Sequence, residues 1–544
     1  MRAATMLATF IRRTEMRMVC PRSIAAITLS ALLLPVVGRA QSFCEPVEVE
    51  STTGATVLGN GSPGSITTTA IQTALDAGGA IVLDQGPNPS TVNLTSTLVA
   101  SRAVVLDGGG LVSLSGGGVR RILDIVNPDP APNAPLFTVT LQRIGLVDGH
   151  TNGGRGGAIY KQHGSEFPHK VSLKLVDCHF EGNDAPLDGS SQDDGGGAFY
   201  AELMNRIDVG GCSFVDNSGS NGGALYSLGS LRVNIVDSLF EANRAIGSGG
   251  NPGNGGNGGA LGVDGAERLV DVCRTRFVDN QSNAFGGGFF SVMYDMLSRS
   301  RFEDVEFRGN LQQSNTEHTG GAYIQDGPWA MERVSFIDNE ARGFGGLFVA
   351  GNAPGTIRNG TFSENVARTG LGAAMALTQS APITIVNTTI ANNVSTEAFA
   401  AGIAIGSPNQ LRLANTVFAN NRGGNVFVNW AMNNPAAFDG GGNMQWPQQR
   451  ISGMTNGGTE TAVTAGSSFA DPQVPATASD QGGLVSTLAL PAASPARDSG
   501  VASVAGSAVG VPATDARGEP RFGAVDRGSY EFGDTNYVFR NGFE

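Results

Sequence analysis

Residues 304–310 read Asp-Val-Glu-Phe-Arg-Gly-Asn, and the same frame returns at 333–339 as Arg-Val-Ser-Phe-Ile-Asp-Asn. An aromatic or apolar residue, two free positions and an asparagine occur nine times between Cys178 and Asn421. The first members of these pairs are Phe180, Phe214, Phe240, Phe277, Phe307, Phe336, Phe362, Ile390 and Phe418. The asparagines are Asn183, Asn217, Asn243, Asn280, Asn310, Asn339, Asn365, Asn393 and Asn421. Successive copies lie about 30 residues apart, a period typical of solenoids.

Each copy also contains short strand signals. Apolar residues alternate, as in Leu231, Val233 and Ile235, and a glycine followed by alanine and an apolar residue precedes the copy, as in Gly223-Ala224-Leu225. Period-two alternation indicates a strand. Asp or Asn three residues before the Phe tolerates a left-handed bend. We therefore predict three strands per coil, with the third ending at the Phe and with coils stacked in parallel.

The repeated pair has a mechanical explanation, which makes all nine asparagines predicted structural residues. The Asn amide carries donors and acceptors, so it can join turn backbone to the Asn of the next coil. The Phe side chains are expected to fill the interior, one per coil, with coils about 4.8 Å apart.

The alternation of Phe-x-x-Asn with Gly-Gly-Ala-Ile/Leu resembles the repeats of polymorphic outer membrane proteins and related bacterial surface proteins. The resemblance covers roughly Gly145 to Asn421. It implies an all-β chain with a right-handed parallel β-helix of the pectate-lyase-like fold.

The sequence divides into five expected parts. Residues 1–40 have the basic start, apolar run and small-residue end of a signal peptide. Residues 41–144 are expected to form an N-terminal cap, with a short helix near Ile71–Leu75, and the first coils, because a solenoid needs its open end covered. Residues 145–430 hold the repeats. Residues 431–532, with Asp515-Ala-Arg-Gly and Asp526-Arg-Gly-Ser-Tyr-Glu, resemble the choice-of-anchor region of bacterial surface β-helix proteins. Residues 533–544 either resemble a short secretion tail or form a flexible C-terminus.

Charge and hydropathy restrict the partners. The formal net charge is −13, and removal of residues 1–40, which hold six Arg and one Glu, makes it more negative. An acidic chain is a poor partner for nucleic acid. No stretch after the signal region is apolar enough to span a membrane. We expect a protein that is secreted or held at the outer surface of a Gram-negative bacterium.

Cysteines and acidic residues suggest two further sites. Cys178 and Cys212 both lie two residues before the repeat Phe, so they are expected on adjacent coils, either as a disulfide or as two buried thiols. No metal-ligand spacing is present. Asp188, Asp193 and Asp194, with Asp184, form either a solvated loop or a calcium site of oxygen ligands.

The strand after each Gly-Ala phrase presents an outer face. Parity places Tyr160, Tyr200 and Tyr226 outside, with Glu202, Asp264 and Asp326 two positions further on, and places Tyr323 and Phe348 inside. Glu202 and Asp264 are expected about 9.6 Å apart, near the separation of carboxylates in inverting glycosidases. The tyrosines either stack on sugar rings, with Asp326 as a further ligand-binding candidate on the same face, or pack under long loops.

Three functions follow from these patterns. The first is a non-catalytic, adhesin-like binder of glycans or surfaces. The second is a polysaccharide lyase or glycoside hydrolase that uses Glu202 and Asp264, although the companion motifs of polygalacturonases and the calcium-site Asp cluster of pectate lyases are missing. The third is a structural component of the cell envelope.

Overall fold

The structure is a computed structural model that describes residues 42–129, 131–161, 168–186, 193–248, 255–266, 268–314, 319–377, 380–396, 400–423, 431–448 and 461–533. Residues from Phe43 onward form one compact unit. The expected signal peptide and all but the first residue of the expected C-terminal tail lie outside the described residues.

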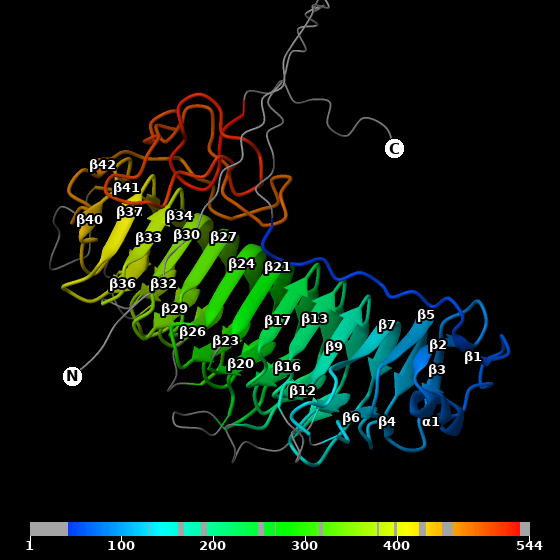
Figure 1. Cartoon of the computed structure of the whole chain (residues 1–544). Coiled ribbons are helices and arrows are strands. Elements are labelled where there is room, and N and C mark those ends of the chain that lie inside the picture. The colour runs from blue at the N-terminus through cyan, green and yellow to red at the C-terminus, as the bar shows by residue number, and fades with distance from the viewer. Residues whose placement is uncertain are drawn as a thin grey trace, which may run out of the picture. The chain divides into compact units, whose positions relative to one another are not determined.

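Three long sheets run along this unit (Figure 1). Sheet A consists of β1 (Thr56–Gly59), β2 (Gly79–Asp84), β3 (Ser90–Asn93), β5 (Val104–Ser115), β7 (Phe137–Val147), β9 (Val171–Val176), β10 (His179–Glu181), β13 (Arg206–Gly210), β14 (Ser213–Val215), β17 (Arg232–Val236), β18 (Leu239–Glu241), β21 (Leu269–Val278), β24 (Arg299–Arg308), β27 (Trp329–Ile337), β30 (Gly355–Ser363), β33 (Ile383–Val386), β34 (Thr389–Ala391), β37 (Leu411–Ala414), β38 (Val417–Ala419), β40 (Phe438–Asp439), β41 (Met444–Trp446) and β42 (Ser468–Phe469).

Sheet B consists of β4 (Leu98–Ala100), β6 (Leu123–Ile125), β8 (Ile159–Lys161), β12 (Phe199–Glu202), β16 (Leu225–Leu228), β20 (Leu261–Gly265), β23 (Phe289–Met293), β26 (Ala322–Gln325), β29 (Leu347–Ala350), β32 (Met375–Leu377) and β36 (Ile403–Ile405). Sheet C consists of β11 (Asp184–Ala185), β15 (Ser218–Gly219), β19 (Arg244–Ala245), β22 (Gln281–Ser282), β25 (Leu311–Gln312), β28 (Glu340–Ala341), β31 (Val366–Ala367), β35 (Val394–Ser395) and β39 (Arg422–Gly423).

Neighbouring strands belong to successive coils and pair in parallel, as β21 does with β24 and β26 with β29. The chain is thus a right-handed parallel β-helix, and the predicted fold class is confirmed. One detail differs from the prediction. The strand that holds the Phe belongs to sheet A, and the third sheet follows the Asn. The bend residues Asp304, Asn359 and Asn387 have φ of 57°, 55° and 47°. In β24 and β30 this bend turns the chain without ending the strand, because pairing with the next coil continues on both sides of it.

The interior contains a column of stacked rings. Ring centroids of successive Phe residues from Phe180 to Phe362 lie 4.6–5.0 Å apart. This separation matches the spacing of paired strands, so each coil contributes one ring to the column.

A ladder of amides runs beside the rings, at the corner between sheets A and C. Its members are the nine repeat asparagines, all of them buried: Asn183, Asn217, Asn243, Asn280, Asn310, Asn339, Asn365, Asn393 and Asn421. In each coil up to the last, the Nδ2 group donates to the Oδ1 of the next asparagine at 2.9–3.0 Å. The same Nδ2 also donates to a backbone carbonyl of the preceding coil, as Asn310 does to Phe277 at 2.9 Å. The asparagines therefore make the coil-to-coil contacts expected of structural residues.

The first coil is capped by the helix α1 (Thr68–Ala77). Thr67 begins it, since its hydroxyl accepts from the backbone N–H of Ala70, and Gly78 ends it at φ 79°. Ile71 and Leu75 are buried against the first coils, which removes the apolar end of the solenoid from water.

An N-terminal strap, residues 43–50, lies along the outer side of sheet A and is tied by a disulfide from Cys44 to Cys273. Glu45 pairs with Arg206 at 2.5 Å, and Glu50 pairs with Lys174 at 2.6 Å. These contacts reach coils far along the chain, so the strap fixes several coils relative to one another.

Of the two alternatives for Cys178 and Cys212, the structure contains the buried thiols and not the disulfide. Both are buried free thiols, and burial raises the pKa of Cys178. They lie on adjacent coils as expected, with the Cys178 backbone N 3.3 Å from Cys212 Sγ. Side chains of paired parallel residues point the same way about 4.8 Å apart, whereas a disulfide holds the Cβ atoms about 3.8 Å apart. Each thiol instead contacts the carbonyl two residues before it.

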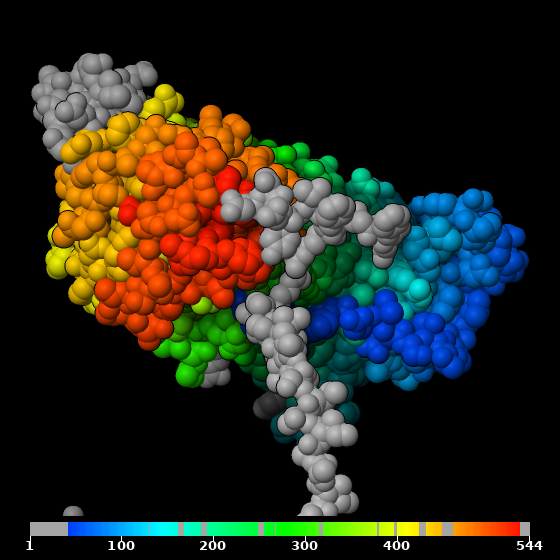
Figure 2. Space-filling view, turned by 90° about the horizontal axis from the view of Figure 1, so that it is seen from above, coloured from blue at the N-terminus to red at the C-terminus, as the bar shows by residue number. Residues whose placement is uncertain are grey.

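The C-terminal segment, residues 461–533, covers the outer side of sheet A towards its C-terminal end. Figure 2 shows this face, with the orange to red segment over the yellow and green coils and the deep-blue strap beside it. Asn387 Nδ2 donates to the carbonyl of Asp526, and Asn392 Nδ2 to that of Pro475, both at 2.9 Å. Asn387 and Asn392, which lie at a bend and a turn of the repeat, therefore also bind the C-terminal segment.

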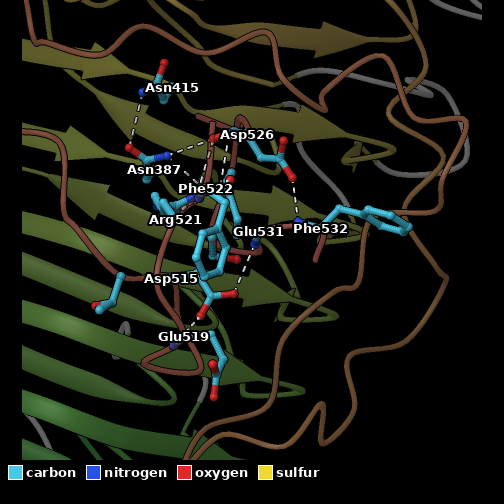
Figure 3. Close-up of polar contacts among 12 residues, drawn as sticks. Asn387, Asn415, Asp515, Glu519, Arg521, Phe522, Asp526, Glu531 and Phe532 are labelled. Carbon is cyan, nitrogen blue, oxygen red and sulfur yellow. Dashed lines mark hydrogen bonds and ion pairs between the residues drawn. The ribbon is translucent and has the colours of Figure 1, made fainter. Parts of the chain in front are cut away.

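The two motifs at Asp515 and Asp526 form one polar network (Figure 3). Asp515 accepts from the backbone of Arg517 and Glu531, and Asp526 accepts from the backbone of Asp498 and Phe532. Arg521 donates to Glu531 at 2.7 Å and to Asn359 of β30 at 2.8 Å. Burial lowers the pKa of Arg521, while burial raises that of Glu531. The motif residues thus fold the segment and join it to the solenoid.

Glu306 of β24 contacts the C-terminal segment, and the stability that this contact provides depends on pH. Burial opposes its charge, but hydrogen bonds from Arg308 and from Ser486 of the C-terminal segment lower its pKa to about 2. A carboxyl whose folded pKa is depressed stabilises the protein above its unfolded pKa, and that stability is lost as the pH falls towards the folded value. For a side chain that is 2% exposed, a shift from 4.5 to about 2 corresponds to a contribution on the order of 3 kcal/mol.

We expect Glu306→Gln to remove this contribution. In urea unfolding, the wild type should lose on the order of 3 kcal/mol more than the variant between pH 5 and pH 2. Glu181→Gln, at a mostly exposed position, is the control and should follow the wild type. Parallel pH curves for the wild type and Glu306→Gln would contradict the role given to this carboxylate.

Candidate functional site

The outer face of sheet B carries a column of aromatic side chains. Strand pairing places the following residues in one register column, in order along the solenoid: Tyr160, Tyr200, Tyr226, Gly262, Phe290, Tyr323, Phe348, Ala376 and Ala404. The neighbouring column, which includes Ile159, Leu225, Ala322 and Leu347, faces the interior.

Two residues of this column were predicted on the wrong side. The glycine phrase predicts Tyr323 and Phe348 inside, but Ala322 pairs with the inward Phe289 and Leu347 pairs with Ala322, so Ala322 and Leu347 take the inner positions. In these coils the glycine phrase is displaced by one residue relative to the strand. A displacement of one residue moves a side chain to the opposite face of a sheet.

The three tyrosines point outward from the sheet, yet they are not an exposed face. Tyr200 and Tyr226 are 0% and 1% exposed, and only Tyr160 is half-buried. Their ring centroids lie 5.6 and 6.0 Å apart, and the Arg155 guanidinium lies 5.1 Å from the Tyr200 ring. Burial also raises the pKa of Tyr200. The prediction of an exposed tyrosine surface is therefore wrong, and these rings have the packing role that was its alternative.

The carboxylates that were proposed as an acid/base pair occupy one column. Glu202 and Asp264 are separated by the coil of Leu228, which agrees with the expected two-coil spacing. Glu202 lies 3.7 Å from Arg155, while Asp264 is buried and its burial raises its pKa. The catalytic role of this pair stays a prediction.

Asp326 does not belong to that column, because Gln325 pairs with Val292 in its place. Asp326 follows β26 with φ 55°, and its carboxylate accepts from the backbone N–H of Asn352 at 3.1 Å. Its position is that of a turn residue, so the geometry gives no support to ligand binding there.

Two of the four candidate calcium ligands contact basic side chains. Asp188 lies outside the described residues. Asp194 is nearly buried and pairs with Arg155 at 2.8 Å, while Asp184 contacts His150 at 2.5 Å. Within the part of the chain that the structure describes, no three His, Cys, Asp or Glu side chains gather as ligands of one metal ion.

A groove of about 500 Å³ opens where the aromatic column ends. We call it the Phe348 groove. Its lining includes residues of β29, β32 and β36, which belong to sheet B. The C-terminal segment covers sheet A instead (Figure 1). Its lining consists of Arg342, Gly343, Phe344, Phe348, Thr369, Gly370, Leu371, Ala376, Leu377, Ala404, Ile405, Gly406 and Asn433.

The change from rings to alanines produces this hollow. Phe348 packs against Tyr323 at 5.4 Å between centroids and against Phe344 at 4.8 Å. On the next two coils the column continues as Ala376 and Ala404. Since each alanine lacks a ring, a space remains beside the partly buried ring of Phe348.

The polar groups of the groove are few and fixed. Asn433 Oδ1 accepts from the backbone N–H of Ile405 at 2.7 Å, which leaves its Nδ2 as a donor. The Thr369 hydroxyl donates to the carbonyl of Arg342 at 3.3 Å. None of the described lining residues is an Asp, Glu, His, Cys or Lys. The groove therefore offers an aromatic wall and a polar rim without a group that could serve as a general base.

Similarity to known proteins concerns the fold. Residues 295–438 match a family model described as the right handed beta helix region. Tailspike protein 3 of bacteriophage CBA120 is 12% identical with a TM-score of 0.40, over 67% of this chain and 58% of the tailspike. The surface adhesin PfbA of Streptococcus pneumoniae is 11% identical with a TM-score of 0.29, over 68% of this chain and 92% of PfbA. No curated protein is similar to the chain in sequence.

The chain thus spans less than two thirds of the tailspike's length. Among the described residues, no helix combines the length and apolar character needed to cross a bilayer.

Proposed function

We propose that this protein is an exported surface protein that binds a saccharide in the Phe348 groove and does not cleave it. The observation that carries the proposal is the replacement of rings by Ala376 and Ala404 directly after Phe348 in one continuous column. A ligand ring placed over these alanines would continue the aromatic stack.

The chemistry of the groove suits a sugar ring. Ligand pockets of about 300–1,000 Å³ typically combine apolar and aromatic walls with a few polar groups that orient the ligand. A pyranose has an apolar face of C–H groups and a rim of hydroxyls. The face matches the rings of Phe344 and Phe348, and the rim matches the Asn433 amide and the Thr369 hydroxyl.

Binding is favoured over cleavage by the residue types in the lining. Glycoside hydrolysis uses two carboxyl groups beside the scissile bond. The described lining contains no carboxyl group, and Arg342 is its one charged side chain. A saccharide held there would be retained unchanged.

Export is supported by the disulfide between Cys44 and Cys273, because disulfides persist in oxidising compartments outside the cytosol. The signal-like residues 1–40 agree with this. The repeats that resemble polymorphic outer membrane proteins, and the anchor-like C-terminal region, further favour the outer surface of a Gram-negative cell as the location.

The test is a saccharide-binding measurement on the full exported chain with two opposite changes. Phe348→Ala removes one of the two rings of the aromatic wall, and Ala376→Phe fills the hollow. We expect each change to weaken binding roughly tenfold to a hundredfold. Phe348→Ala loses a buried aromatic contact at the centre of the interface, which contributes on the order of 2 kcal/mol, and Ala376→Phe occupies the space that the ligand would take. Phe522→Ala, at an exposed position in the C-terminal segment, should bind as the wild type does. Wild-type binding by both groove variants would overturn the proposal.

A further inference from the structure

The Phe348 groove has a charge of its own that differs from that of the chain. The formal net charge is −13, yet the described lining contains one arginine and no carboxylate. We infer that the groove selects saccharides whose sugar residues carry a carboxylate, which Arg342 binds. This inference rests on the proposed function and names the ligand class of the same site.

The backbone of Arg342 is held firmly while its side chain is left for a ligand. Its N–H donates to Gln312 Oε1 at 3.1 Å, and its carbonyl accepts from the backbone N–H of Thr369 at 2.8 Å and of Gly370 at 3.0 Å. The guanidinium makes no ion pair or hydrogen bond with any residue that the structure describes. An arginine placed in this way is available to an anion without first breaking an internal contact.

The equivalent arginine of the next coil shows the difference. Arg368 follows β31 as Arg342 follows β28, so the two occupy matching positions. Arg368 pairs with Glu340 at 2.8 Å and donates to the carbonyl of Gln312 at 2.7 Å. Its charge is therefore neutralised within the protein, whereas that of Arg342 lacks such a partner in the described chain.

A second donor supports an anionic ligand. Because Asn433 Oδ1 accepts from Ile405, its Nδ2 group is left to donate. Arginine forms paired, parallel hydrogen bonds with a planar carboxylate, and such charge-assisted bonds are stronger than those between neutral groups. The groove thus combines an aromatic wall for the ring with donors for its acidic group.

The test compares three polymers on the full exported chain: alginate, which is a polymer of carboxylated pyranoses, its carboxyl-reduced form, and dextran sulfate. We expect alginate to bind at least about tenfold more tightly than the reduced polymer, the difference expected for a charge-assisted hydrogen bond. Its binding should also weaken as salt is raised. Tighter binding of dextran sulfate than of alginate would overturn the assignment of a carboxylate.

Variants separate the inference from the proposed function. Arg342→Gln should weaken alginate binding about tenfold and remove the preference over the reduced polymer, while Arg342→Lys, which keeps the charge but loses the planar fork, should lie between. Arg102→Gln removes the same charge at an exposed position at the other end of the solenoid and should match the wild type.

If Arg342→Gln binds alginate as the wild type does, the inference fails. If Phe348→Ala also leaves all binding unchanged, the proposed function fails with it. Thermal unfolding of each variant checks that the fold is retained.

Discussion

Replacing Asn310 with Asp is expected to lower the free energy of unfolding by about 3 to 5 kcal/mol at neutral pH, the range found when a buried charge is left without a partner. Asn310 is fully buried, and its Nδ2 donates to both Asn339 Oδ1 and the carbonyl of Phe277. An ionised carboxylate cannot donate, so both acceptors would face a negative oxygen. The change adds no bulk, so the expected loss comes from hydrogen bonding and charge alone.

The loss of unfolding free energy caused by Asn310→Asp should depend on pH. Burial among acceptors raises the pKa of a carboxyl group. A group whose folded pKa is raised destabilises the fold less as the pH falls, because the protonated form can donate one hydrogen bond. The deficit of Asn310→Asp relative to the wild type should therefore shrink between pH 7 and pH 4 in urea unfolding. Asn352→Asp, at an exposed position, is the control and should stay near the wild type. A deficit that does not depend on pH would contradict this account of the ladder.

The ladder and the ring column could be predicted from the sequence because both repeat. One Phe and one Asn per coil suffice to define an interior column and a corner, and the bend residues before the Phe have the left-handed conformation that Asp and Asn tolerate. These features depend on contacts between adjacent coils, which the period of the repeat specifies.

Burial on the outer faces could not be predicted in the same way. Parity shows that Tyr200 points away from the interior, but not that Arg155, from the turn before an earlier strand, lies over its ring. Likewise, Cys273 pairs with Cys44, which is 229 residues away. The covering segments are not repeats, so no period indicates where they lie.

The Phe348 groove was missed for a different reason. Its signal is present in the sequence as the pairs Met375-Ala376 and Ile403-Ala404, in which a small residue takes the outer position. This signal indicates a groove only if Phe348 lies on the outer face of the sheet, whereas the position of the glycine phrase predicts Phe348 on the inner face. Strand pairing resolves this because Phe348 pairs with Ala376, and Ala376 with Ala404.

Truncation of Phe307 to Ala is expected to cost about 3 to 5 kcal/mol of unfolding free energy, as for other fully buried Phe side chains. Its ring is 0% exposed and stacks on Phe277 at 4.8 Å and on Phe336 at 4.6 Å, with an edge contact to Phe302 at 6.2 Å. The neighbouring rings are held by the spacing of the coils, so they cannot collapse into the space that is left. We therefore expect a value near the upper end of this range.

Comparison of two variants at this site tests that argument. Phe307→Leu fills part of the space and should cost roughly 1 to 2 kcal/mol, because it loses the stacking contacts but leaves a smaller cavity. Phe522→Ala, at a position that is 49% exposed, should change stability little. The measurement is urea unfolding followed by circular dichroism, with the slope compared between variants to confirm that the same surface is exposed. Equal losses for Phe307→Ala and Phe307→Leu would show that the coils close around the vacant position, and the stack would then not be the rigid column that its parallel rings indicate.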